Sequence, residues 1–133
     1  MATIFTRIFD GDIPGTFVWQ DDRCGAFMSI NPLRRGHVLV APRDEIDDWL
    51  DAPPELREHL FDVAHSIGVA QQRAFTPARV GLMIAGLEVA HLHLHVVPID
   101  GVNDLDFANA ATSVDRDELE SAAAEIRAHL PQP

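Results

Sequence analysis

The sequence contains no lysine, and all ten of its basic residues are arginine. A Schiff-base lysine, a pyridoxal phosphate anchor and a Walker-type phosphate loop each depend on a lysine amine, so the sequence excludes all three. The ten bases stand against 21 acidic residues, which gives a net charge of −11. This charge argues against nucleic acids and anionic membranes as partners, because both are polyanions.

Cysteine and long apolar runs are scarce as well. Cys24 is the one cysteine, which excludes an internal disulfide and a zinc site built from several cysteines. No run approaches the roughly 20 apolar residues of a membrane span, and the first residues lack the pattern of a signal peptide. We therefore expect a cytoplasmic protein, and the length of 133 residues fits one domain over residues 1–133.

Histidines alternate with apolar residues over the stretch 91–98, which reads His-Leu-His-Leu-His-Val-Val-Pro. Strict alternation predicts a β-strand that ends at Pro98. On a strand the histidines would share one face, about 6 to 7 Å apart, and the apolar residues would pack on a core. Like charges at that spacing disfavour protonation of neighbouring rings, so we expect largely neutral imidazoles that can act as nucleophile or metal ligand. The histidines are His91, His93 and His95, and the apolar residues are Leu92, Leu94 and Val96.

The rest of the pattern predicts an α+β fold with a mainly antiparallel sheet. Thr3 would cap a short apolar helix, and an acidic cap at Asp51 with prolines in the first turn would start the principal helix, which runs to about Arg73. Asp115 and Glu118 have the spacing of a capping box for a last helix. Strands are expected at 16–20, 24–28, 37–41 and 80–85, and the polar stretch 100–113 is expected to be an irregular, mobile loop.

Several motifs together resemble those of the histidine triad (HIT) superfamily, in the branch of histidine triad nucleotide-binding proteins. The run at 91–97 resembles the signature in which three histidines alternate with hydrophobic residues. Gly-His-Val-Leu-Val-Ala-Pro at 36–42 resembles a second landmark, as do Thr-Ile-Phe at 3–5, Gly-Asp-Ile-Pro at 11–14 and Asp-Asp-Arg-Cys-Gly-Ala-Phe at 21–27. The resemblance covers residues 3–98, which is most of the chain.

This resemblance implies a five-stranded antiparallel sheet with one long crossing helix and short N-terminal and C-terminal helices. It also implies a homodimer with one continuous sheet, and hydrolysis or transfer at the α-phosphate of a nucleotide substrate without a metal or another cofactor. The implied roles are His93 as the nucleophile, His91 and His95 as orienting and phosphate-contacting groups, and His37 as a supporting fourth histidine. The positions that match the base pocket are Ile4, Phe5, Ile8 and Phe27.

The chemistry of imidazole supports these roles independently. A neutral imidazole can attack phosphorus and form a nucleotidyl-histidine intermediate. His95 and backbone amides near Gly86 can donate hydrogen bonds to the phosphoryl oxygens. The leaving group stays open, because nucleoside phosphoramidates, acyl nucleotides and dinucleoside polyphosphates all present an α-phosphate to the same histidine.

Two positions depart from the family pattern. Ser29 stands two places after Phe27, where the family usually has an acidic residue that binds the ribose hydroxyls, and serine lacks that charge-assisted hydrogen bond. Glu88 stands three places before His91, where many members have a serine or threonine that contacts phosphate. A carboxylate there would repel phosphate, so Glu88 either points away or pairs with a histidine or with an amine of the leaving group.

Two other readings of the histidines stay open. Alternating histidines on a strand also build metal sites, with His37 as a further ligand. A non-catalytic nucleotide-binding module would keep the binding site and lose the chemistry, with Ser29 and Glu88 as signs of that change. Activity in the presence of a chelator tests the first reading, and the effect of His93→Ala on turnover tests the second.

Overall fold

Five strands form one antiparallel sheet in the computed structural model, which describes residues 2–131. The strand order is β1-β2-β3-β5-β4, so β3 is central and β1 and β4 are the two edges. The predicted α+β fold with a five-stranded antiparallel sheet is confirmed. The strands are β1 (Phe17–Gln20), β2 (Cys24–Met28), β3 (Val38–Pro42), β4 (Arg79–Met83) and β5 (Leu94–Ile99).

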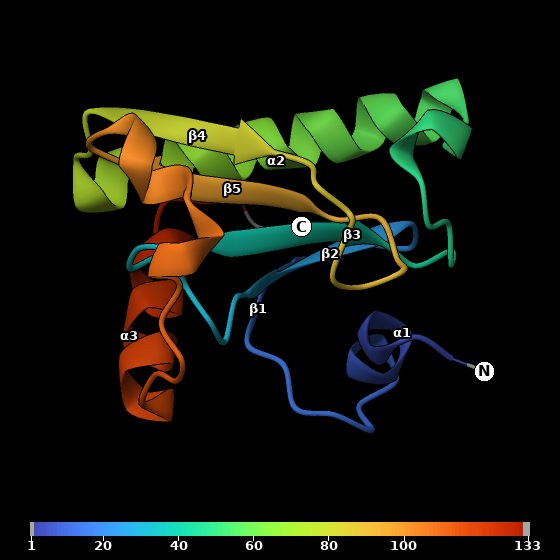
Figure 1. Ribbon diagram of the computed structural model, residues 1–133, viewed down its shortest axis with the longest axis horizontal. Helices are drawn as coiled ribbons and strands as arrows, with labels where there is room; N and C mark the ends of the chain where they lie inside the picture. The colour runs from blue at the N-terminus through green and yellow to red at the C-terminus, as the bar shows by residue number, and fades with distance from the viewer. Residues whose placement is uncertain (1, 132–133) are drawn as a thin grey trace.

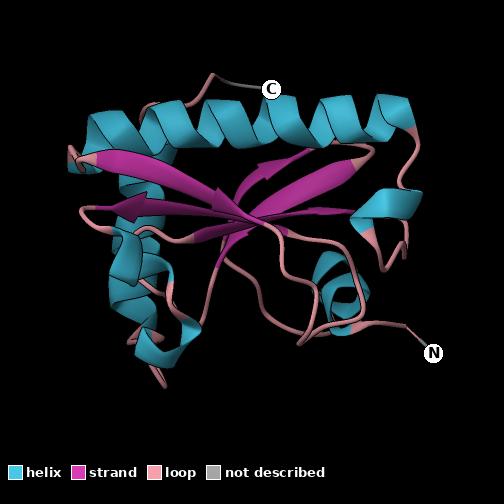
Figure 2. Ribbon diagram, turned by 45° about the horizontal axis from the view of Figure 1, so that its top comes forward, coloured by secondary structure: helices cyan, strands magenta, loops and turns pink. Residues whose placement is uncertain are grey.

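Three α-helices lie on different sides of this sheet (Figure 1). The long α2 (Pro54–Phe75) covers one face, and the short α1 (Ile4–Phe9) lies on the opposite side, while α3 (Arg116–Arg127) stands at one end (Figure 2). The 3-10 helices are η1 (Trp49–Asp51), η2 (Val102–Leu105) and η3 (Phe107–Asn109). None of the helices within residues 2–131 combines the length and the apolar character that a membrane crossing needs.

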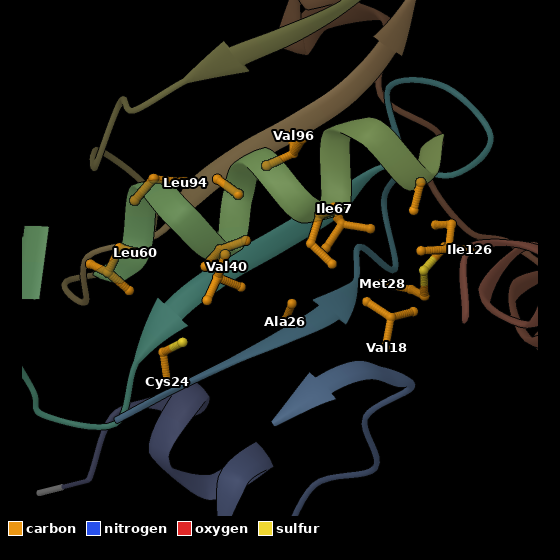
Figure 3. Packing of buried hydrophobic residues seen from close by; sticks show 14 of the residues in the cluster. Val18, Cys24, Ala26, Met28, Val40, Leu60, Ile67, Leu94, Val96 and Ile126 are labelled. Atoms are coloured by element: carbon orange, nitrogen blue, oxygen red, sulfur yellow. The ribbon is translucent and has the colours of Figure 1, made fainter. Parts of the chain in front are cut away.

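The two faces of the sheet pack against different cores. Val38 and Val40 of β3 join the main core, where residues of the sheet pack against α2 and α3 (Figure 3). The alternate residue Leu39 packs on the other face with Phe5 of α1 and Phe27 of β2. This alternation follows from the two-residue period of a strand. The second face is therefore the one on which α1 can approach the histidines.

The short helix α1 forms for the predicted reason. The hydroxyl oxygen of Thr3 accepts a hydrogen bond from the backbone N–H of Thr6, which caps the helix. Phe5 is buried, and its ring packs edge-on against Phe27 with centroids 5.3 Å apart. An aromatic contact thus attaches α1 to the sheet.

The strand β5 starts later in the histidine row than predicted. It begins at Leu94, so His91 and His93 lie in the preceding loop and only His95 lies on the strand. The prediction that all three histidines share one strand face is therefore wrong. The prediction for the apolar positions is confirmed, since the main core includes Leu92, Leu94 and Val96.

The predicted strand end at Pro98 is off by one residue, because β5 runs to Ile99. Pro98 pairs with Val80 of β4, and Pro42, which is the last residue of β3, pairs with Cys24 of β2. Both prolines lie beyond the short stretch over which β3 and β5 pair with each other. One edge of the strand therefore has no partner at these positions, and a residue without an amide proton is tolerated there.

Three further predictions on local structure need correction. The helix α2 spans Pro54–Phe75, and the expected cap Asp51 belongs to η1 instead. Asp115 caps α3 as predicted, but Glu118 forms an ion pair with Arg35 and does not close a capping box. The stretch 100–113 is not irregular throughout, because it contains η2 and η3.

Candidate active site

A cavity of about 590 Å³ is bounded by α1, β2, β3, β5, the loop after η3 and the start of α3. Its volume lies in the range of small-molecule sites. The fully buried His91 does not line it, and neither does Gly86. The other predicted site residues all do: His37, His93, His95, Ile4, Phe5, Ile8, Phe27, Ser29 and Glu88.

The ring of His93 has its proton fixed on one nitrogen. Its Nδ1 lies 2.7 Å from the backbone carbonyl oxygen of His91, and since a carbonyl oxygen can only accept, Nδ1 donates. In a neutral ring this leaves Nε2 without a proton. His93 is 5% exposed and lines the cavity, so this nitrogen offers a lone pair in the cavity wall.

The ring of His95 has the opposite proton arrangement. The backbone N–H of Leu33 donates to Nδ1 of His37 over 3.0 Å, so a neutral His37 carries its proton on Nε2. This Nε2 lies 3.0 Å from Nδ1 of His95 and donates to it. His95 therefore keeps its own proton on Nε2. The rings of His93 and His95, with centroids 4.8 Å apart, thus offer a lone pair and an N–H donor side by side.

The buried His91 has both ring nitrogens occupied. Its Nε2 lies 2.7 Å from the backbone carbonyl oxygen of Pro42, and its Nδ1 lies 2.6 Å from the hydroxyl oxygen of Thr3. It faces His93 through its backbone carbonyl, not through its ring. His91 is thus placed to orient His93 and has no free nitrogen for a ligand.

Burial keeps the cavity histidines neutral. Burial, with smaller effects from His95 and His93, lowers the pKa of His37 to about 3. Burial and the neighbouring His93 lower the pKa of His95 to about 4. Burial also lowers the pKa of His93, although its hydrogen bond to the His91 carbonyl acts in the opposite direction. The lowered pKa values of His93 and His95 agree with the expected neutral imidazoles near pH 7, and burial is the main cause.

The turn before β3 places His37. Gly36 has φ +91°, and a Cβ at this position would lie 2.4 Å from the ring of Phe75, so only glycine fits. The Gly36 carbonyl accepts a hydrogen bond from Nε2 of the buried Gln71, which also donates to the carbonyl of Val96. Through Gln71, α2 holds together the start of β3 and the middle of β5.

Aromatic rings pack against both cavity histidines. Phe5 of α1 lies edge-on to His93, with ring centroids 4.9 Å apart, and Phe107 of η3 lies edge-on to His95 at 5.2 Å. These contacts restrict rotation of the two imidazoles. Sequence reasoning missed Phe107, whose only signal is that it is an aromatic residue in an otherwise polar stretch.

Ser29 is buried at the end of β2, where it lines the cavity. Its hydroxyl oxygen accepts a hydrogen bond from the backbone N–H of Asn31, which leaves the hydroxyl proton available. The side-chain amide of Asn31 donates to the backbone carbonyls of Ala111 and Thr112. Asn31, which sequence reasoning also missed, therefore ties the loop after β2 to the segment before α3.

Charged residues approach the cavity from two sides. Glu88, in the loop between β4 and β5, is exposed. Burial lowers the pKa of His93, and the negative charge of Glu88 offsets part of this lowering. Arg116, at the start of α3, also lines the cavity. Motif comparison could not find Arg116, because it lies beyond the stretch that the motifs cover. Gly86 belongs to the same loop as Glu88 and has φ +74°.

Possible metal ligands gather away from the cavity. Within residues 2–131, ligand atoms of Asp21, Cys24 and His59 lie within 4.8 Å of one another. Hydrogen bonds already occupy this cluster, since one Asp21 carboxylate oxygen accepts from the ring N–H of Trp19 and from Nε2 of His59. Burial and the Asp21 charge raise the pKa of the Cys24 thiol to about 12, which disfavours a thiolate ligand. The cluster stabilises the turn between β1 and β2.

Comparisons with known proteins identify relatives over most of this chain. A model of the HIT domain family matches residues 10–102. An uncharacterized HIT-like protein of Methanocaldococcus jannaschii is 31% identical over 121 residues, which cover 87% of this chain and 94% of that protein. The protein hit of Bacillus subtilis is 32% identical over 106 residues, or 76% of this chain and 73% of that protein.

Solved structures show the same arrangement of elements. A Hit-like protein of Bartonella henselae, described as involved in cell-cycle regulation, superposes with a TM-score of 0.83 at 30% identity over 96% of both chains. A zinc-bound histidine triad family protein of Mycobacterium smegmatis gives a TM-score of 0.81 at 28% identity, over 97% of this chain and 93% of that one. With the matched family model and these relatives, the chain belongs to the histidine triad (HIT) domain family.

Proposed function

We propose that this protein is a nucleotide hydrolase or nucleotidyl transferase that acts at the α-phosphate through a nucleotidyl-histidine intermediate on His93. Membership of the HIT family supports a role in nucleotide binding, hydrolysis or transfer in general. The observation that carries the finer proposal is the pair of opposite tautomers, with an unprotonated Nε2 on His93 beside a protonated Nε2 on His95.

The reaction would proceed in two displacements at phosphorus. In the first, Nε2 of His93 attacks the α-phosphorus, the N–P bond forms, and the bond to the leaving group breaks with its electron pair. The hydrogen bond from Nδ1 to the His91 carbonyl stabilises the positive charge that develops on the ring. The N–H of His95 donates to a phosphoryl oxygen. In the second, water attacks the same phosphorus and the N–P bond breaks with its electron pair returning to Nε2. The proton that water loses balances the proton that the leaving group takes up, and the nucleoside monophosphate leaves.

The rest of the cavity wall supports a nucleotide substrate. The apolar side formed by α1 and Phe27 can hold a flat base, although such a wall discriminates poorly between bases. The hydroxyl of Ser29 is available for a ribose hydroxyl, without the charge of the acidic residue that is usual there. The candidate substrates remain nucleoside phosphoramidates, acyl nucleotides and dinucleoside polyphosphates.

The test is hydrolysis of adenosine 5′-phosphoramidate and of a dinucleoside polyphosphate in the presence of a chelator. We expect turnover by the wild type and by the control His129→Ala, which changes an exposed histidine, and no measurable turnover by His93→Ala. Nucleotide binding without turnover in the wild type would favour the non-catalytic module. Turnover that disappears in chelator would favour metal chemistry.

We also propose that two copies form a homodimer through the edge strand β4. Leu82 of β4 and Phe61 of α2 are 44% and 59% exposed, and both line a groove of about 300 Å³ between these elements. Exposed apolar side chains beside an unpaired strand edge favour pairing with a second copy. Light scattering should show a dimer that Leu82→Asp dissociates, while Leu50→Asp, at an exposed leucine of η1, leaves the dimer intact.

A further inference from the structure

A hydrogen-bonded cluster joins the start of α1 to the histidine row. The Glu45 carboxylate accepts hydrogen bonds from the backbone N–H of Thr3 at 2.6 Å and from the hydroxyl of Thr6 at 2.9 Å. The hydroxyl oxygen of Thr3 in turn lies 2.6 Å from Nδ1 of His91. The cluster thus connects α1, the segment after β3 and the loop before β5, and Figure 1 shows this loop passing close to α1.

The direction of each hydrogen bond follows from the partners. The hydroxyl of Thr6 donates to the Glu45 carboxylate, and the backbone N–H of Thr6 donates to the hydroxyl oxygen of Thr3. Nε2 of His91 donates to the Pro42 carbonyl, so in a neutral ring Nδ1 is an acceptor. The Thr3 hydroxyl has two acceptors in reach, Nδ1 of His91 at 2.6 Å and Oγ1 of Thr6 at 3.3 Å, and the shorter contact assigns its proton to the fully buried His91 ring.

The same region fixes the backbone that faces His93. The Pro42 carbonyl holds the His91 ring, and the backbone N–H of Leu92 donates to the carbonyl of Ile46 over 2.7 Å. Between these two anchors, the His91 carbonyl accepts the Nδ1 proton of His93. Because His93 precedes β5, the strand ladder does not hold it. Its orientation depends on the anchors around His91.

We propose that Thr3 and Glu45 are positioning residues, which we call the Thr3–Glu45 clasp. The clasp holds His91 and, through the His91 carbonyl, sets the orientation and tautomer of His93. The proposal rests on the nucleophilic role of His93 proposed above. The clasp also couples the base pocket to the nucleophile, because Phe5 of α1 packs on the rings of His91 and His93 with centroids 5.4 and 4.9 Å away.

Two substitutions of Thr3 separate the hydrogen bond to His91 from the helix cap. Thr3→Ser keeps both the capping oxygen and the hydroxyl proton, whereas Thr3→Asp keeps a capping oxygen and has no proton to donate at neutral pH. We expect Thr3→Asp to lower kcat by about tenfold to a hundredfold, with a smaller change in KM, because a misplaced nucleophile slows the chemical step. Thr3→Ser should restore kcat to near the wild-type value.

NMR of the imidazole nitrogens gives a readout that does not depend on activity. We expect the wild type and Thr3→Ser to show His93 protonated on Nδ1, and Thr3→Asp to show mixed tautomers of His93 and a second proton on His91. Glu45→Ala changes an exposed side chain and should shift the same signals by a smaller amount. This variant replaces Thr3→Asp in the experiment if Thr3→Asp does not fold.

The outcomes are distinguishable from those of the proposed function. An unchanged His93 tautomer and unchanged kcat in Thr3→Asp and Glu45→Ala would overturn the clasp, and so would an equal loss of kcat in Thr3→Ser and Thr3→Asp. If the wild type turns over no nucleotide while Thr3→Asp still alters the His93 tautomer, the proposed function fails and the clasp stands.

Discussion

The four histidines of the site form two pairs that are held in different ways. His93 is linked to the backbone carbonyl of His91, which leaves the outer nitrogen of His93 with a lone pair. His95 is linked to the ring of His37, which leaves the outer nitrogen of His95 with a proton. Adjacent imidazoles of identical chemistry are thus given opposite roles by the groups behind them, a carbonyl in one case and a ring N–H in the other.

The two pairs also depend on different parts of the chain. The His91 and His93 pair lies in a loop and is anchored by α1 and the segment after β3. The His37 and His95 pair is anchored by the backbone N–H of Leu33 and by the turn at Gly36. Changes near α1 and the segment after β3 should therefore affect the nucleophile His93. Changes near the turn at Gly36 should affect the hydrogen-bond donor His95.

The largest effect should come from replacing the cavity-lining histidine of each pair by asparagine. We expect His93→Asn to lower kcat by about a thousandfold or more, because no nucleotidyl-enzyme forms. His95→Asn should lower kcat only about tenfold, because the asparagine amide still donates a hydrogen bond. Steady-state turnover and trapping of a labelled nucleotidyl-enzyme measure both, with His129→Asn as the control. Equal losses in the two variants would contradict opposite roles for the rings.

The next effect concerns the turn that supports the second pair. Gly36→Ala should lower the free energy of unfolding by about 3 kcal/mol, since it adds a clash with Phe75 to the cost of a positive φ. Gly86→Ala is the matched control, because Gly86 also has a positive φ and its Cβ would meet nothing within 4 Å. Its loss should be about 1 kcal/mol, from backbone strain alone. Urea denaturation measures both, and similar losses would show that the contact with Phe75 is unimportant.

The sheet and the helices could be predicted because their signals are local. Hydrophobic alternation gave the buried positions of β5, and the cap at Thr3 gave the start of α1. The start of β5 could not be predicted, because an extended loop has the same alternation as a strand. Here the ring of His91 donates to the Pro42 carbonyl and the backbone N–H of Leu92 donates to the Ile46 carbonyl, so this segment is held outside the ladder.

Only those parts of the site that lie within the matched motifs could be predicted from the sequence. His37, His93 and His95 lie within matched motifs and line the cavity, and so do Ile4 and Phe5 of α1. Phe107 and Arg116 lie beyond those motifs, and only the tertiary fold brings them to His95 and the cavity. The tautomers could not be predicted from the sequence either. The His91 carbonyl fixes the tautomer of His93, and the backbone N–H of Leu33 fixes that of His95 through the ring of His37.

A smaller effect should follow from removing the group behind His95. His37→Leu leaves Nδ1 of His95 without its donor, so the proton of His95 can move to Nδ1 and away from the substrate. We expect kcat to fall about tenfold, with the His95 tautomer changed in NMR spectra and that of His93 unchanged. His37→Gln, which keeps an amide donor, should recover part of the activity. A change in the His93 tautomer in His37→Leu would show that the two pairs are not independent.

The smallest effect is on the pH dependence of stability. The pKa values of His37 and His95 in the folded protein, about 3 and about 4, lie below the ordinary value of 6.5. The unfolded chain therefore binds more protons than the folded protein in the window between these values, and the free energy of unfolding falls as the pH falls below about 6.5. Each buried ring should contribute a loss of about 1 kcal/mol between pH 6.5 and 5.5, a range above the titration of ordinary carboxylates. Urea denaturation at the two pH values should therefore show a fall about 1 kcal/mol smaller in His37→Leu than in the wild type. An identical fall in both proteins would mean that His37 is not held neutral by burial, and the tautomer assigned to His95 would lose its support.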